Sequence, residues 1–282
     1  MKRYLYFLNK YVVILLFLQI IFFFNSSANP NIQKDTSLPV KQNIDYIDPT
    51  IGNVAQLLEP TRPTVHLPNQ VIRVYPIRKD YLDDQISSFP LTAVSHRLGE
   101  VFAIKPSTGD INIESWNRRM SYDNDLEITR PWYYSTYLVD DGVTVEFAPS
   151  KKTGCYRFTF PGGKNKSILF NVYNKGDASW HFISGNELTA METWHEDIKI
   201  YMYGVFNIAG AAGVVENNHL KSGTIIEGKS ARVFISFPPG ASVIEFKYAI
   251  SFVSPEQARK NFEEEISTKD FEIGRASCRE RV

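Results

Sequence analysis

Five histidines and several adjacent carboxylates are the residues that could carry acid, base or metal chemistry. The histidines stand at His66, His96, His181, His195 and His219. No two of them have the spacing of a helical metal site or of a Cys/His zinc site. The pairs Asp83-Asp84 and Asp140-Asp141 fall in expected loops, where solvated turns are the simpler interpretation. No Gly-x-Ser-x-Gly elbow and no glycine-rich phosphate loop occurs, so the residues alone predict no catalytic group and no metal ligand.

The tryptophans offer a different chemistry, because an indole can stack on a sugar ring. They stand at or near the ends of expected strands, at Trp116, Trp132, Trp180 and Trp194. Each indole could instead fill the core, so both interpretations stay open at this point. The segment Trp194-His195-Glu196-Asp197 joins two expected strands and is typical of a polar hairpin turn.

Composition excludes several classes of protein. The chain has 282 residues with 31 basic and 31 acidic side chains, so it carries no basic excess for binding nucleic acid. Its 13% aromatic content argues against a disordered chain. We therefore expect an ordinary globular protein with no nucleic-acid partner.

Short strands dominate the hydrophobic pattern. Residues 143–147, 198–202 and 244–248 alternate apolar and polar side chains with a period of two. Further runs of β-branched and aromatic residues occupy 133–138, 156–160, 168–173, 188–193 and 232–237. Turn signals such as Asp140-Asp-Gly142 and Pro238-Pro-Gly240 separate them. This spacing predicts an all-β fold, an antiparallel β-sandwich that ends near residue 253.

One helix is predicted, and it comes late in the chain. Ser254 supplies a capping hydroxyl, Pro255 stands at the first helical position and Gln257 follows three residues after the cap. These signals predict a short C-terminal linker helix that begins at Pro255 and runs to about Ile266, within a linker segment over 254–271.

The N-terminus has the pattern of a secretory signal. Lys2, Arg3 and Lys10 precede an apolar run over residues 11–24, and small residues allow cleavage after Ala28. A permanent anchor is the alternative, but about 14 apolar residues fall short of the ~20 that cross a bilayer. We expect a signal peptide over 1–28, a polar leader over 29–44, and export to the periplasm or outer surface of a Gram-negative bacterium.

The C-terminus breaks the pattern of the rest of the chain. Residues 272–282 are abruptly arginine-rich and resemble the translation of a sequencing-library adapter. A genuine basic tail is the alternative. On the adapter interpretation, the natural chain continues beyond Phe271. Cys278 belongs to this tail, so Cys155 would be a single thiol, for which a buried and inert position is the default.

Several segments together resemble the N-terminal domain of glycoside hydrolase family 92, the exo-acting, calcium-dependent α-mannosidases. Tyr46-Ile-Asp-Pro-Thr-Ile-Gly52 is similar to the family's opening motif, and the stretches 102–110, 127–149 and 156–161 resemble its next strands and hairpin. The most specific likeness is Ile250-Ser-Phe-Val-Ser-Pro-Glu-Gln-Ala-Arg-Lys-Asn261, which in the family leads toward the second domain. The resemblance covers residues 45–266.

This resemblance implies a sandwich of the galactose-mutarotase-like type over 45–253, followed in the complete protein by an (α/α)6 barrel. The implied activity is hydrolysis of terminal α-mannosides by an inverting mechanism, with the sugar bound between the two domains. The catalytic carboxylates and the calcium ligands would lie in the barrel. The partners would be a glycan and the missing barrel, and this fragment alone would be inactive.

The family's pocket-lining loops indicate candidate binding residues. Residues 53–70 are only distantly similar to the glycine- and histidine-rich loop of the family, and residues 95–99 retain a Ser-His pair but lack the second histidine. We expect His66, His96 and Arg97 to contribute polar contacts and Trp116 or Trp132 to stack on the sugar. A free-standing carbohydrate-binding or surface-interaction module is the alternative function.

Overall fold

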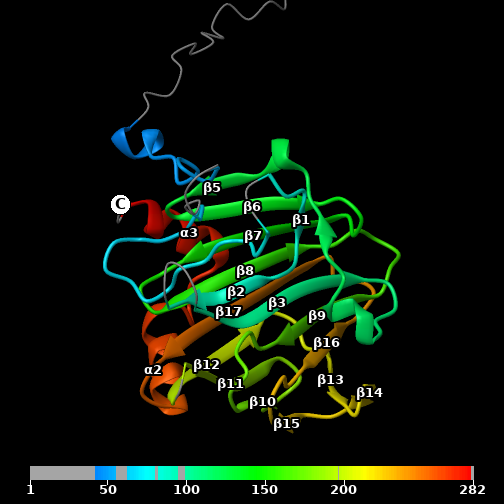
Figure 1. Cartoon of the computed structure of the whole chain (residues 1–282). Helices are drawn as coiled ribbons and strands as arrows, with labels where there is room; N and C mark the ends of the chain where they lie inside the picture. Colours follow the sequence, from blue (N-terminus) through cyan, green and yellow to red (C-terminus); the bar gives the residue numbers. More distant parts are fainter. Residues whose placement is uncertain (1–41, 55–61, 80–81, 95–98, 196, 281–282) are drawn as a thin grey trace, which may run out of the picture. The chain divides into compact units, whose positions relative to one another are not determined.

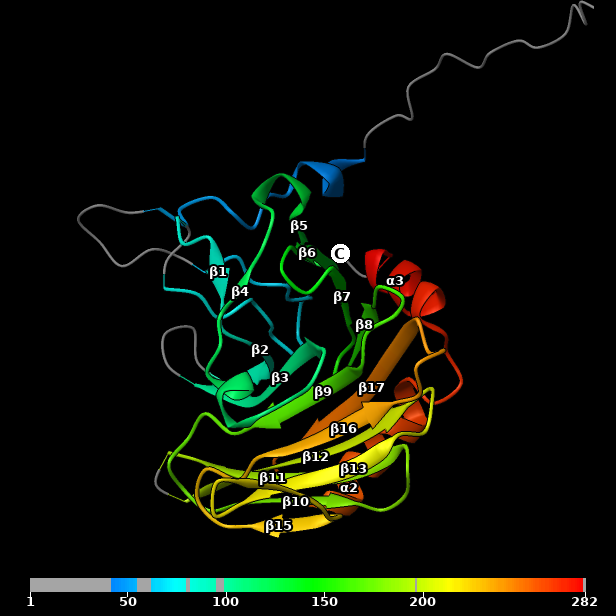
Figure 2. The same ribbon diagram turned by 90° about the vertical axis from the view of Figure 1, so that its right-hand side faces the viewer.

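Two antiparallel sheets face each other across an aromatic core (Figures 1 and 2). They belong to a computed structural model that describes residues 42–54, 62–79, 82–94, 99–195 and 197–280. Apart from Gln42, these residues form one compact unit. The prediction of an all-β antiparallel sandwich is confirmed.

The larger sheet has nine strands in the order β15-β10-β11-β12-β17-β8-β7-β6-β5. Along this order the strands are β15 (Ile225–Glu227), β10 (Ala178–Phe182), β11 (Glu187–Trp194), β12 (Ile198–Phe206), β17 (Val243–Ser251), β8 (Thr153–Thr159), β7 (Val143–Pro149), β6 (Tyr133–Leu138) and β5 (Ile128–Arg130). The predicted strands over 133–138, 143–147, 156–160, 188–193, 198–202 and 244–248 all lie in this sheet.

The smaller sheet has six strands in the order β14-β13-β16-β9-β3-β2. They are β14 (His219–Ser222), β13 (Ala211–Glu216), β16 (Val233–Phe237), β9 (Lys166–Asn171), β3 (Glu100–Thr108) and β2 (Phe89–Ala93). A separate pair is formed by β1 (Gln85–Ile86) and β4 (Met120–Ser121). Three short 3-10 helices complete the described irregular segments: η1 (Asn43–Tyr46), η2 (Ile113–Trp116) and η3 (Asn124–Leu126).

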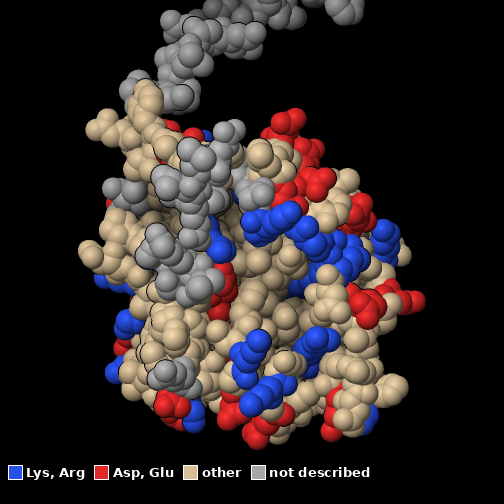
Figure 3. Space-filling view, viewed as in Figure 1, with Lys and Arg blue, Asp and Glu red and all other residues tan. Residues whose placement is uncertain are grey.

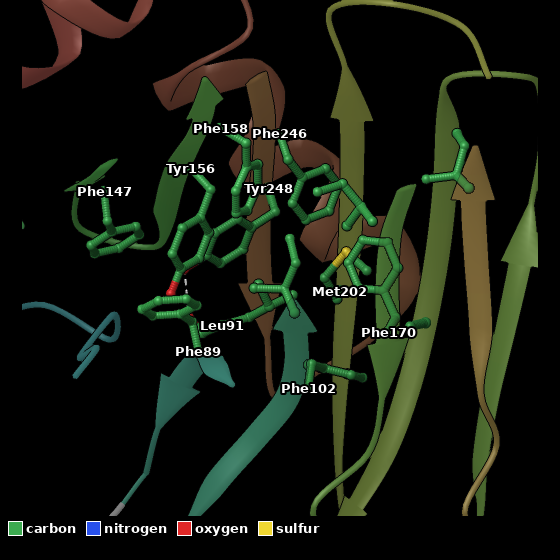
Figure 4. Packing of buried hydrophobic residues seen from close by; sticks show 14 of the residues in the cluster. Phe89, Leu91, Phe102, Phe147, Tyr156, Phe158, Phe170, Met202, Phe246 and Tyr248 are labelled. Carbon is green, nitrogen blue, oxygen red and sulfur yellow. Dashed lines mark hydrogen bonds between the residues drawn. The ribbon is translucent and has the colours of Figure 1, made fainter. Parts of the chain in front are cut away.

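The core is built from rings contributed by both sheets (Figure 4). Tyr156 of β8 and Tyr248 of β17 are fully buried, and their hydroxyls donate across the sandwich to the carbonyls of Pro90 (2.7 Å) and Leu91 (2.5 Å) in β2. These bonds satisfy the polar ends of the two rings, which burial would otherwise penalise. They also fix the spacing of the sheets. Gly154 is needed beside them, because a Cβ there would lie 2.6 Å from Tyr248 Oη.

The period of two separates the two faces of the nine-stranded sheet. On β8, Tyr156 points into the core, whereas Cys155 belongs to a second cluster on the opposite face. That outer face is covered by α2 (Pro255–Glu265), whose Phe262 ring packs edge-on against Tyr203 at 5.1 Å. The sequence therefore places apolar residues on both faces of these central strands.

Helix α2 follows its sequence signals closely. The Ser254 hydroxyl accepts the Gln257 N–H at 3.1 Å, and Pro255 opens the helix as predicted. The buried Asn261 amide donates to the Ile250 carbonyl at 2.9 Å, which ties the helix to the end of β17. The segment predicted as a linker is thus packed against the sheet over this helix.

A second helix, α3 (Phe271–Arg279), was not predicted. It contacts β7 and β8, and among the side chains of this helix that the structure describes, that of Phe271 joins the apolar cluster of the outer face. Arg157 packs on the Phe271 ring at 4.0 Å and also donates to Glu272 at 2.8 Å. Most of residues 272–282, the segment that resembles an adapter, therefore folds as part of α3. That this segment comes from an adapter stays a prediction. None of the helices in the described ranges has the length and hydropathy of a membrane span.

Candidate functional site

An ion pair joins described residues in or next to the two segments that resemble the family's pocket loops. Arg62 lies within the first of them, residues 53–70, and donates at 2.9 Å to the carboxylate of Glu100, which directly follows the second, residues 95–99. The Tyr75 hydroxyl donates to the same carboxylate oxygen at 2.5 Å, and the Arg62 guanidinium lies 4.9 Å from the Tyr75 ring centroid. Burial and this hydrogen bond raise the pKa of Tyr75, so it remains a donor at ordinary pH.

Backbone pairing explains why these residues meet. Val65 and Val74 form an antiparallel bridge, and the Ala93 N–H donates to the Arg73 carbonyl at 2.8 Å, which lays residues 62–75 beside β2. The Val94 N–H donates to the Gly99 carbonyl at 2.8 Å and closes the connection between β2 and β3. One edge of the molecule therefore carries residues 62–75 and the start of β3.

A buried carboxylate lies beneath this edge. Glu192 of β11 is 1% exposed, and its Oε1 accepts the backbone N–H groups of Tyr173 (2.8 Å) and Asn174 (2.7 Å). The same oxygen accepts Asn174 Nδ2 at 2.6 Å, whereas Oε2 accepts the Phe102 N–H at 2.6 Å. Burial raises the pKa of Glu192 to about 7, against the four donors that favour its ionised form. This side chain joins β11 to β3 and to the loop after β9.

Phe102 shows how tightly these segments are held. Its φ is 52°, in the left-handed region that a bulky residue rarely adopts. Its ring nevertheless packs edge-on against buried Trp180 at 5.6 Å, while its N–H is bound by Glu192. Strained residues of this kind persist where surrounding contacts over-determine the backbone.

The predicted binding residues are distributed unevenly. His96 and Arg97 lie outside the described residues. His66 lies on the segment beside β2, where burial and the nearby Arg73 charge lower its pKa. Trp132 lies in the turn between β5 and β6 and packs against Leu67, the neighbour of His66. The structure thus brings His66 and Trp132 to one region.

Trp116 lies apart from that region, on the six-stranded sheet. Its indole N–H donates to the Phe170 carbonyl at 2.9 Å and its ring packs edge-on against Phe234 at 6.2 Å. Both Trp116 and Trp132 are 8% exposed, so each contributes substantially to packing. Their stacking on a sugar stays a prediction.

A second buried carboxylate was also missed from the sequence. Glu127, which precedes β5, pairs with Arg78 at 3.2 Å, and both side chains are 4% exposed. The Tyr134 hydroxyl donates to the other Glu127 oxygen at 2.8 Å, and Arg78 also donates to the Tyr122 hydroxyl. The residue type does not distinguish a buried glutamate from an exposed one. Neither Glu127 nor Glu192 could therefore be identified from the sequence alone.

No metal centre can be built from the part of the chain that the structure describes. No group of three or more His, Cys, Asp or Glu side chains there could hold a metal ion. Cys155 is buried, and burial raises the pKa of its thiol, as expected of an inert cysteine. The described residues therefore provide no carboxylate cluster that would suit calcium.

Comparisons with known proteins identify a family and similar structures for this fold. Residues 46–251 match the family model described as the glycosyl hydrolase family 92 N-terminal domain. A family GH92 inverting mannosidase from Bacteroides thetaiotaomicron VPI-5482 superposes with a TM-score of 0.77 at 19% identity, over 86% of this chain and 36% of that one. A family GH92 alpha-mannosidase from Bacteroides thetaiotaomicron gives a TM-score of 0.75 at 23% identity, over 84% and 36%.

A more distant structure shares the fold. A bacterial glucoamylase complexed with acarbose matches with a TM-score of 0.51 at 11% identity, over 82% of this chain and 39% of that one. No curated protein sequence matches the chain. The chain thus spans little more than a third of the length of the solved structures that it resembles.

Proposed function

Because this chain belongs to glycosyl hydrolase family 92, whose N-terminal domain it carries, we propose that the complete protein is an α-mannosidase-like hydrolase of terminal α-mannosides. The observation that carries the proposal is the family match over residues 46–251. The structural likeness to two family GH92 mannosidases supports the same architecture.

In this proposal the chain forms one wall of the sugar pocket. The supporting contact is the Arg62–Glu100 ion pair, which joins a residue of the first pocket-loop segment to the residue that follows the second. His66, His96 and Arg97 would hydrogen-bond the sugar from this wall, with Trp132 or Trp116 as the stacking ring. The other wall would come from an (α/α)6 barrel that follows this domain in the complete protein.

The proposed mechanism inverts the anomeric centre. One carboxylic acid protonates the leaving oxygen while a second carboxylate activates a water on the opposite face of the sugar. The buried acids Glu127 and Glu192 are poorly suited to either role, because each is almost fully buried and already accepts several hydrogen bonds. We place the catalytic pair and the calcium ligands in the barrel, and we expect the chain alone to be inactive.

Export completes the proposal. The basic start, apolar run and small residues before Asn29 would direct the protein to the periplasm or outer surface, where glycan ends are accessible. N-terminal sequencing of the protein secreted by the source cell would give Asn29 as the first residue. Retention of Met1 would contradict cleavage.

The decisive experiment begins with the gene. Resequencing the source locus across the Phe271 codon should reveal a long continuation, and the complete protein should release mannose from an α-mannobiose. Proton NMR at early times should detect β-mannose first, because inversion of an α-linkage gives the β-anomer. A genomic stop after Val282, or α-mannose as the first product, would overturn the corresponding part of the proposal. The 282-residue chain assayed in parallel should release no mannose.

A further inference from the structure

A groove opens where three segments of the two sheets meet. Its volume is about 680 Å³, within the range of small-molecule sites. It is lined by the beginning of β3, the loop between β9 and β10, and the end of β11. Its lining includes the side chains of Glu100, Asn174, Lys175, Trp194 and His195.

The floor of the groove is held rigidly. Glu192 binds the backbone of Asn174 and of Phe102, so β11 fixes both neighbouring segments through one side chain. Gly176 lets the loop lie flat on β11, because a Cβ there would approach the Thr193 Cβ to 2.7 Å. A floor fixed in advance reduces the entropy lost when a ligand binds.

Two rings form an apolar wall. Trp194 is half-buried and packs against the core, and His195 is exposed, with its ring edge-on to the indole at 5.3 Å. His195 has a φ of 48°, a left-handed conformation that is uncommon for a histidine. This backbone geometry ends β11 and holds the imidazole against Trp194 at the mouth of the groove.

Planar polar groups lie on the same groove. Asn174 Nδ2 donates to the Glu192 carboxylate (2.6 Å) and to the Glu100 carbonyl (3.0 Å). Its Oδ1 can therefore accept a hydrogen bond from a ligand. The Glu100 carboxylate adds acceptor oxygens, and its charge is balanced by Arg62. The face shown in Figure 3 carries side chains of both charges, with Lys and Arg gathered to the right of its centre. The chemistry favours a neutral ligand with one apolar face and several hydroxyls.

We propose that this groove binds a neutral sugar unit of a glycan. Trp194 and His195 supply the apolar surface for a pyranose ring, and Asn174 and Glu100 accept hydrogen bonds from its hydroxyls. Glu192 acts as a positioning residue, because it holds Asn174 and does not itself reach the groove surface. The inference rests on the proposed function only for the expectation that the sugar is mannose.

Ligand-observed NMR on the 282-residue chain tests this inference, with an α-mannobiose, maltose and lactose as separate probes. We expect saturable, millimolar binding of α-mannobiose. The His195→Ala variant removes an exposed ring and should weaken binding several-fold without loss of fold, and Trp194→Ala should weaken it about tenfold or more. His181→Ala, which removes an exposed imidazole from β10, is the matched control and should bind like the parent.

Each outcome decides a different statement. No saturable binding of any probe, or binding that His195→Ala and Trp194→Ala leave unchanged, would overturn the groove as a sugar site. Binding of maltose or lactose in place of α-mannobiose, lost in both variants, would support the groove and contradict the mannoside assignment. Failure of the complete protein to hydrolyse mannosides would leave the groove's binding data standing, so the two proposals fail separately.

Discussion

The regions around Glu127 and Glu192 each contain a carboxylate that is almost completely buried, but their partners differ. Glu127 faces a guanidinium, that of Arg78, and the Tyr134 hydroxyl. Glu192 faces four N–H donors, three of which belong to the backbone, and the described contacts of its carboxylate include no cation. One region neutralises its charge with another charge, whereas the other surrounds the carboxylate with N–H dipoles.

This difference determines what each region contributes. A buried ion pair can be replaced as a unit, because both partners are side chains, and apolar replacements of similar size are often neutral or stabilising. The backbone donors around Glu192 cannot be removed by substitution, so any replacement must leave N–H groups without an acceptor. The ion pair of Glu127 therefore anchors β5 locally, and apolar residues could replace it. Glu192 is tied to the shape of the groove, where perturbed acids are typically found.

The largest expected effect comes from breaking the ion pair on one side. Arg78→Met leaves the Glu127 carboxylate buried beside the Tyr134 hydroxyl without its cation, so we expect a loss of roughly 3–5 kcal/mol in the free energy of unfolding. Urea denaturation followed by circular dichroism measures this change.

A double variant sharpens the comparison. Arg78→Met combined with Glu127→Leu should recover a substantial part of that loss, because no buried charge remains. Arg259→Met is the control, since its ion pair with Glu263 is exposed and we expect a change below about 1 kcal/mol. A double variant no more stable than Arg78→Met would show that the Glu127 region is not replaceable as a unit.

The next effect is a pH dependence specific to Glu192. Its pKa of about 7 in the fold lies above the ordinary glutamate value of 4.5, so the folded state holds its proton over a range in which the unfolded chain releases it. Stability from this group is present below about pH 4.5 and is lost as the pH rises through 7, by about 3 kcal/mol in total. Denaturation curves from pH 4.5 to 8 measure it.

The Glu192→Gln variant isolates this contribution, because it removes the titrating group. The free energy of unfolding of the parent, minus that of the variant, should decrease as the pH rises from 4.5 to 8. A difference that is flat or rises with pH would mean that the four N–H donors outweigh burial, so that Glu192 is already ionised below pH 4.5 and the dipoles alone compensate its charge.

The sequence predicted the sheets better than it predicted either carboxylate. Strands such as β6, β7 and β12 carry alternation or aromatic runs, which report burial directly. β13 (Ala211–Glu216) was missed because its small residues and Gly213 weaken that signal, and β2 because Pro90 interrupts a short run. The edge strands β14 and β15 are mostly exposed and carry little pattern.

The site depends on contacts between distant parts of the chain. Glu192 meets Phe102 across 90 residues and Arg78 meets Glu127 across 49, distances over which periodicity carries no information. The likeness to family motifs identified the pocket-loop segments, and the Arg62–Glu100 contact joins a residue of the first to the residue after the second. Trp194 and His195 were singled out as a turn, and their place on the groove follows only from the β3 and β9 segments packed beside them.

The smallest effect concerns α3, whose fastening contrasts with both buried regions. Beyond Phe271 its ion pairs lie mostly at the surface: Arg275 pairs with Glu272 at 2.6 Å, and Arg279 pairs with Asp45 at 2.9 Å. Glu272 also pairs at 2.8 Å with Arg157, whose side chain is largely buried. Pairs of this kind contribute about 0–1 kcal/mol each and are screened by salt. A chain that ends at Phe271 should therefore lose less than about 2 kcal/mol, and less still in high salt.

A chain that ends at Asp270 also loses the buried Phe271 ring and should lose roughly 1.5–3 kcal/mol more. Equal stability of the two truncated chains would show that the ring contributes nothing. A large loss on removing residues 272–282 alone would make α3 as integral to the sandwich as the buried carboxylates are.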